Sequence, residues 1–293
     1  MSKVLVTHNS SFHTDDIFAV ATLLLVESNL EIIRTRDKEK INSADYVVDV
    51  GFINDASRQR FDHHQPGGAG VRENGIQYAS FGLVWKAYGS QLTGGEREAG
   101  LIDRELAQPV DAHDNGMAIV EYKFLGVRDY AIGDYFSSFI ESRDTEHLNQ
   151  VFVQCVGMAK ELLLREIRIA KKTIADQDKV SAIYNVSQDK RVIVLDAELS
   201  GWREILAKTP EALYAVHPRP DGNWGINCVP DFSKPQFGVN RKSFPVEWGG
   251  KAGEDVQSIS GVPDALFVHR GLFMASAKTK DGAIALAERA ANA

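Results

Sequence analysis

Three short segments of this sequence place histidine beside aspartate. Imidazole nitrogen and carboxylate oxygen together suit Mn, Fe or Zn, and one carboxylate can bridge two cations. The pattern therefore predicts a two-metal hydrolytic centre. The side chains that the three segments supply are His8, His13, Asp15 and Asp16, then Asp62, His63 and His64, and then Asp111, His113 and Asp114.

Asp49 lies near the end of a predicted strand at 46–50, a position that suits a carboxylate shared by two cations. Two cations about 3.5–4 Å apart can hold both the attacking and the leaving oxygen of a displacement at phosphorus. His8, Asp49 and His63 each fall at the end of a predicted strand. In open parallel sheets ligands bind beyond the carboxyl ends of the strands. We therefore expect these three side chains to meet at one edge of a sheet.

Strands alternate with helices through the first half of the chain, which is typical of an α/β fold with a mostly parallel sheet covered by helices. The strands expected there are 3–7, 31–36, 46–50 and 60–62, and the helices are 15–27, 76–88 and 96–108. A long charged helix should begin at 145, ahead of a smaller α+β region. Its expected strands are 182–184, 191–195, 214–217, 224–229, 266–269 and 272–275.

The composition is that of an ordinary globular protein, with 44% hydrophobic and 25% charged residues in 293. A formal net charge of −7 argues against a protein that coats long nucleic acid, although bound cations would reverse the local field. No apolar run approaches the ~20 residues that span a bilayer, and the N-terminus has the pattern of a strand. We therefore expect a cytoplasmic protein without a membrane partner.

Cys155 and Cys228 form no C-x-x-C pair and are expected to be buried thiols.

Four motifs, at 7–16, 48–51, 61–65 and 110–116, resemble the DHH phosphoesterase superfamily. They resemble more closely its melanocyte proliferating gene family of metal-dependent hydrolases. Segment 80–85 resembles a helix of that family, and 240–242, 248–250 and 267–273 resemble its substrate-domain motifs. The likeness covers nearly the whole chain. It implies a DHH-type catalytic domain at 1–144, a linker helix at 145–180 and a smaller substrate-binding domain at 181–293.

The resemblance also implies two divalent cations per chain. One would be held by His8, His13 and Asp49, and the other by Asp15, Asp49, His63 and Asp111. Asp49 and His64 would be the catalytic side chains, with His64 facing the bridging water or the phosphate. The superfamily's common motif has an aspartate where His13 stands. The imidazole of His13 makes the first site slightly softer, and this favours Mn, with Mg, Co and Zn as alternatives.

The substrate implied by the resemblance is short single-stranded RNA, degraded from the 3′ end by a two-metal-activated water. Hydrolysis of a small nucleotide or phosphoanhydride is the alternative, favoured by the acidic charge and the lack of an aromatic stacking tract. A non-catalytic metal-binding scaffold is the third interpretation. Arg241, His269 and Arg270 are candidates for binding a substrate phosphate, which guanidinium matches bidentately. The roles of His113 and Asp114 stay open, as does the oligomeric state, for which a homodimer is one alternative.

Overall fold

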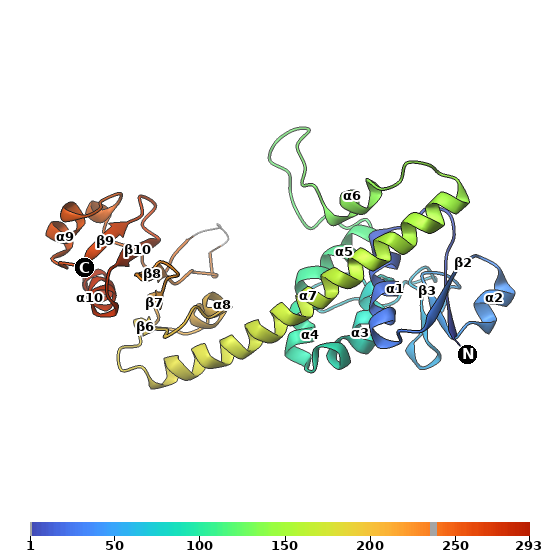
Figure 1. Cartoon of the computed structure of the whole chain (residues 1–293), viewed down its shortest axis with the longest axis horizontal. Helices are drawn as coiled ribbons and strands as arrows, with labels where there is room; N and C mark the ends of the chain where they lie inside the picture. Colours follow the sequence, from blue (N-terminus) through green and yellow to red (C-terminus); the bar gives the residue numbers. More distant parts are fainter. Residues whose placement is uncertain (1, 235–238) are drawn as a thin grey trace. The chain divides into compact units, whose positions relative to one another are not determined.

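The structure is a computed structural model that describes residues 2–234 and 239–293. The chain divides into two compact units, Met1–Lys171 and Lys172–Ala293 (Figure 1). Each unit has its own cluster of buried apolar side chains. Among the described helices, none has the length and apolar character that a membrane span requires.

A five-stranded sheet in the order β2-β1-β3-β5-β4 forms one layer of the first unit. Its strands are β1 (Lys3–Thr7), β2 (Leu30–Arg34), β3 (Tyr46–Val48), β4 (Asn54–Asp55) and β5 (Arg60–Phe61). All neighbours pair in parallel except β4 with β5. Leu5 and Val6 are both buried because the two faces of a parallel strand are covered. The carboxyl ends of β1, β3 and β5 therefore share one edge, directly followed by His8, Asp49 and Asp62.

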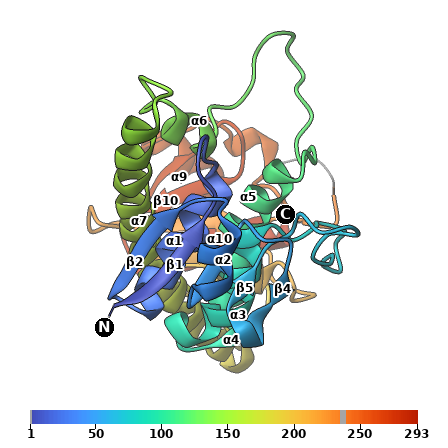
Figure 2. The ribbon, with the colours of Figure 1, turned by 90° about the vertical axis from the view of Figure 1, so that its right-hand side faces the viewer.

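Helices cover this sheet and carry the remaining residues of the predicted centre. Phe18 stacks on Phe81 between two of them, with ring centroids 5.1 Å apart. In Figure 2 the strands β1 and β2 lie side by side in front of α1. The helices of this unit are α1 (Thr14–Val26), α2 (Lys38–Ser43), α3 (Ser80–Thr93), α4 (Glu96–Ile102), a π-helical turn (Asp103–Ala107), α5 (Gln108–Asp114) and α6 (Ile132–Ser137).

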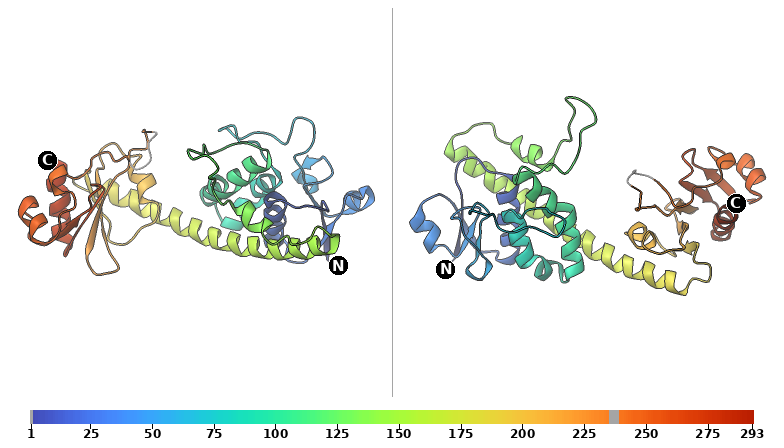
Figure 3. Two further views of the ribbon diagram at one scale, coloured as in Figure 1. Left: turned by 90° about the horizontal axis from the view of Figure 1, so that it is seen from above. Right: turned by 180° about the vertical axis from the view of Figure 1, so that it is seen from behind.

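One long helix, α7 (Thr145–Val186), contributes to the cores of both units. Its first part buries Phe152 and Leu163 against the first unit, and its last part buries Val180 in the second. Figure 3 shows it uninterrupted from two further sides. The second unit has a sheet of order β6-β7-β8-β10-β9, with β6 (Val192–Val194), β7 (Tyr214–Pro218), β8 (Trp224–Cys228), β9 (Ala265–Val268) and β10 (Met274–Ala277). Its helices are α8 (Trp202–Leu206), α9 (Glu254–Ser260) and α10 (Lys280–Asn292).

The fold class expected from the sequence is confirmed: an α/β unit with a mostly parallel sheet precedes a long helix and a smaller α+β unit. The expected strand at 182–184 is wrong, because this segment continues α7 and packs with Val180 at helical spacing. The helix expected at 96–108 is instead split into α4, the π-helical turn and α5. Helices α2, α6 and α9 and strand β4 were not expected. The three-part assignment of domain roles stays a prediction.

Candidate metal centre

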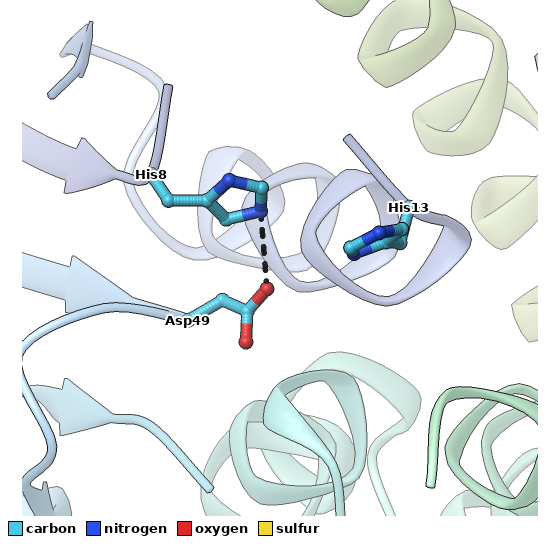
Figure 4. A group of neighbouring side chains, drawn as sticks. All are labelled: His8, His13 and Asp49. Carbon is cyan, nitrogen blue, oxygen red and sulfur yellow. Dashed lines mark ion pairs between the residues drawn. The ribbon is translucent and has the colours of Figure 1, made fainter. Parts of the chain in front are cut away.

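Asp49 lies at the middle of a buried cluster of imidazoles and carboxylates. It follows β3 with a φ of 57°, a left-handed conformation that is uncommon outside glycine and enriched in aspartate. Its Oδ2 lies 3.3 Å from His8 Nε2, and its Oδ1 lies 3.3 Å from His63 Nε2. The hydroxyl of Ser80 donates a hydrogen bond to Oδ1 at 3.1 Å. Figure 4 shows the His8 ring directed at this carboxylate, with His13 nearby. One carboxylate thus faces imidazoles that follow two different strands.

The three side chains of the segment Asp62-His63-His64 lie in different environments. Asp62 is buried, and its Oδ1 lies 2.8 Å from His64 Nδ1, which donates to it. His63 is buried, and its Nε2 lies 3.1 Å from Asp114 Oδ2 on α5. His64 is 52% exposed and lines the cavity above the cluster. The segment therefore supplies one supporting carboxylate, one buried ring and one ring open to a ligand.

Asp15 is fully buried and binds the first turn of α3. It accepts hydrogen bonds from the backbone N–H groups of Ser80 at 2.9 Å and Phe81 at 2.7 Å. Helix N-termini favour anionic partners because their first N–H groups are unpaired. Burial nevertheless raises the pKa of Asp15 well above its usual value, and the nearby charges of Asp49 and Asp114 raise it further. The site thus holds several carboxylates close together, and a bound cation would reduce the repulsion between them.

Asp16, the neighbour of Asp15, faces another part of the cluster. Its Oδ1 accepts the backbone N–H of His13 at 2.8 Å, as one half of a capping box at the start of α1. Its Oδ2 lies 3.0 Å from His8 Nε2. Asp16 therefore caps the N-terminus of α1, and the same carboxylate also contacts a histidine of the centre.

The carboxylates raise the pKa values of the buried histidines. Burial lowers the pKa of His8, but contacts with Asp16 and Asp49 outweigh it and raise the pKa to about 10. Burial also lowers the pKa of His63, and Asp114 and Asp49 raise it to about 11. Asp49 itself has a pKa far below its usual range, since His63 and His8 offset its burial. The centre therefore strongly favours positive charge.

Three groups of described side chains have ligand atoms close enough together to hold a metal ion. They are His8, His13 and Asp49; Asp49, His63 and His64; and Asp15, His63 and Asp114. His8 Nε2, Asp16 Oδ2 and His63 Nε2 are buried and lack a hydrogen bond of good geometry, although all lie near oppositely charged groups. Buried polar atoms are almost always paired, so unpaired ones that converge fit a site built to hold a cation. Mixed nitrogen and oxygen donors match Mn, Fe or Zn.

Asp111 lies in the same buried region but contacts other partners. Arg72 Nη2 lies 2.8 Å from its Oδ2, and the backbone N–H of Gly82 donates to its Oδ1 at 3.0 Å. A Cβ at Gly82 would lie 1.9 Å from Oδ2, so this approach requires glycine. Burial raises the pKa of Asp111 to about 7, in spite of Arg72. Among the described groups that could hold a metal, Asp114 appears where Asp111 was expected. The ligand role of Asp111 stays a prediction.

The substrate-binding candidates of the second unit lie in two places. Arg241 uses its guanidinium to donate to backbone carbonyls at and after the end of α8, those of residues 206, 207, 209 and 212. These bonds hold the end of α8, so phosphate binding by Arg241 would have to compete with them. His269 follows β9 and accepts the N–H of Gly271 at its Nδ1 at 2.9 Å, while Arg270 is exposed in the same turn. Phosphate binding by all three stays a prediction.

Comparison with known proteins gives one family and several relatives. The family model MYG1_exonuc, described as an uncharacterised protein family (UPF0160), matches residues 4–291. The MYG1 protein of Caenorhabditis elegans is 26% identical over 330 residues, which cover 99% of this chain and 95% of that protein. The human MYG1 exonuclease is 26% identical over 322 residues, 96% of this chain and 84% of that protein.

A solved structure with a weaker likeness is RecJ from Thermus thermophilus in complex with Mn²⁺. It aligns with a TM-score of 0.31 and 13% identity over 99% of this chain. The alignment covers 52% of RecJ, so this chain spans about half its length.

Proposed function

Since the chain belongs to the MYG1 exonuclease family (UPF0160), we propose that it is a two-metal phosphodiesterase that degrades short single-stranded RNA from the 3′ end. The human relative, named MYG1 exonuclease, aligns over 96% of this chain and supports cleavage of phosphodiester bonds in a nucleic acid. RNA as the substrate, the polarity and the use of two cations are parts of this proposal.

Asp49 carries the proposal, because its carboxylate belongs to two of the three groups that could hold a metal. A carboxylate with separate imidazoles at its two oxygens suits a bridge between two cations. We assign His8, His13 and Asp49 to one cation, and Asp49, His63, Asp15 and Asp114 to the other. Asp114 enters this set because of its contact with His63, and Asp111 lies behind it, bound to Arg72.

The proposed mechanism gives each remaining side chain a defined task. When bound, the cations would acidify a water molecule and neutralise charge at phosphorus, and Mn²⁺ suits the donor set. Asp62 holds the His64 ring through Nδ1, which leaves Nε2 free to contact a phosphate oxygen. Ser80 fixes the Asp49 carboxylate, and α3 fixes Asp15. His64 is the protein side chain we expect to touch the substrate phosphate.

Hydrolysis of a small nucleotide or phosphoanhydride is the second candidate function. The formal net charge of −7 favours it, because extended nucleic acid is attracted to basic surfaces. The same centre would serve both reactions, since each transfers a phosphoryl group to water. A substrate panel is therefore needed to separate the two functions.

Purified protein with Mn²⁺ should shorten 5′-labelled oligoribonucleotides stepwise and release mononucleotides from 3′-labelled ones. EDTA should stop the reaction, and added Mn²⁺ should restore it. Exclusive cleavage of pyrophosphate or polyphosphate would show that the RNA assignment is wrong. The absence of turnover on every phosphoester and phosphoanhydride, with Mn²⁺ still bound, would support the scaffold interpretation.

A further inference from the structure

A second cavity opens beside the candidate metal centre. The cavity of the centre has a volume of about 760 Å³ and is lined by His13, Asp15, His63, His64 and Asp114, among others. The neighbouring cavity has about 450 Å³, and the two share wall residues that include Thr14, His113 and Tyr122. A ligand bound at the centre could therefore extend directly into the second space.

The second cavity is chemically unlike the first. Its walls are mainly apolar, from Leu106, Pro109, Val110, Met117, Ile119 and Ile132. Its polar lining residues include Thr14, Glu105, His113 and Asp129. Small-molecule sites of ~300–1,000 Å³ typically combine apolar walls with a few polar groups that fix orientation. Such a lining suits a flat heteroaromatic ring and offers little to a phosphate.

One wall of this cavity comes from a long loop at 117–131, which joins α5 to α6 (Figure 1). The loop is fixed at both ends: Met117 N–H donates to the Ala112 carbonyl at 2.8 Å, and Arg128 Nη2 donates to Asp134 Oδ1 at 2.7 Å. Between these anchors Tyr122 is exposed and borders both cavities. Exposed apolar side chains in a cluster usually mark a binding surface.

We propose that the second cavity is a base pocket, which binds the nucleobase of one nucleotide flanking the scissile phosphate, with Tyr122 stacking on the base. The pocket rests on the proposed phosphodiesterase function, because it needs a phosphate at the centre. Base-on-aromatic contacts tolerate any base, because every base has a π-face, so this pocket would accept all four bases of RNA. A pyrophosphate would leave this pocket empty.

The test compares oligoribonucleotides that differ only in one base. Pentanucleotides with all bases, and pentanucleotides lacking the base on either side of the terminal phosphodiester, are given to the Mn²⁺-loaded full-length protein. We expect removal of one of these two bases to raise KM about 10-fold, the cost of one lost stack. Tyr122→Ala should raise KM on the intact oligomer by a similar factor and leave KM on that abasic oligomer unchanged. Tyr122→Phe should retain the wild-type KM.

Tyr130→Ala is the matched control, because Tyr130 is an exposed aromatic residue of the same loop that lines neither cavity. Its KM values should equal those of the wild type. Equal cleavage of intact and abasic oligomers by the wild type would overturn the base pocket and leave the phosphodiesterase function standing. An effect of Tyr130→Ala as large as that of Tyr122→Ala would also overturn it.

Binding measured without turnover separates failure of the pocket from failure of the function. The Kd of fluorescent AMP for the Mn²⁺-loaded protein should be about 10-fold lower than the inhibition constant with which ribose 5-phosphate displaces it. Tyr122→Ala should remove that difference. If no oligomer is cleaved but AMP keeps its advantage, the proposed reaction fails and the pocket stands. If AMP has no advantage, the pocket is refuted whatever the activity.

Discussion

Asp49→Asn should remove both candidate cation sites and leave the fold in place. Asparagine has nearly the same shape as aspartate and also tolerates the left-handed backbone, here with a φ of 57°. The substitution removes the charge from two of the three groups that could hold a metal. Asp114→Asn removes a charge from only one group, so the pair gives a graded test of the centre.

The expected loss of Mn²⁺-dependent stability in Asp49→Asn follows from the linkage between metal binding and folding stability. At a Mn²⁺ concentration of about 100 times Kd, one occupied site stabilises the folded chain by about 2.7 kcal/mol. A 100-fold weaker site retains about 0.4 kcal/mol, and loss of even a supporting residue weakens metal sites 10- to 100-fold, by order of magnitude. Asp49→Asn should therefore lose about 2.3 kcal/mol at each of two sites. At about 2–4 °C per kcal/mol, the Mn²⁺-dependent rise in Tm should shrink by roughly 9–18 °C.

Thermal melts in EDTA and in Mn²⁺ measure this difference for the wild type and each variant. Asp114→Asn should lose about half as much of the rise as Asp49→Asn. Asp255→Asn, at an exposed position on α9 in the other unit, should keep all of it. A full Mn²⁺-dependent rise in Asp49→Asn would refute the bridging role. The melt in EDTA shows separately whether the variant is folded.

Four other predictions concern residues outside the cation ligands. Arg72→Met should destabilise the protein by about 3–5 kcal/mol in urea unfolding, since it leaves the buried Asp111 carboxylate without its guanidinium partner. Arg241→Met should cost about 1.5–3 kcal/mol through the carbonyls it no longer binds, and lost turnover at unchanged stability would instead favour substrate binding. Burial raises the pKa of Cys155 to about 11 and of Cys228 to about 12, so at pH 8 Ellman's reagent should react with them only after unfolding. The unfolded thiols lose protons near pH 9 while the folded ones keep them, so urea midpoints should fall as pH rises above about 9.

The placement of His8, Asp49 and His63 at one edge of a sheet was predictable from the sequence because it depends on local patterns. Short β-branched runs predict strands, and in a parallel sheet their carboxyl ends must lie at the same edge. Their closeness along that edge depends on the observed strand order, which pairs β1 with β3 and β3 with β5 and which local patterns do not report.

The contact between Asp114 and His63 was not predictable, because it depends on contacts distant in sequence. Both residues lie on α5, three positions apart, and a π-helical turn directly before α5 alters the helix phase. Arg72 and Gly82 bind Asp111, which leaves Asp114 to face His63. No local pattern reports such partners. The carbonyl contacts of Arg241 were unpredictable for the same reason, since these carbonyls lie at and after the end of a separate helix.

The exposed loop at 117–131 also makes the chain easy to cut without unfolding it. Tyr122, Phe124 and Tyr130 are exposed on a segment without regular secondary structure, which is the substrate that chymotrypsin requires. Val110 before the loop and Phe136 after it belong to the same core, so the two fragments should stay associated in a native gel and separate only in detergent. A nucleotide whose base covers Tyr122 should slow the cut, which would make protease resistance an inexpensive screen for ligands.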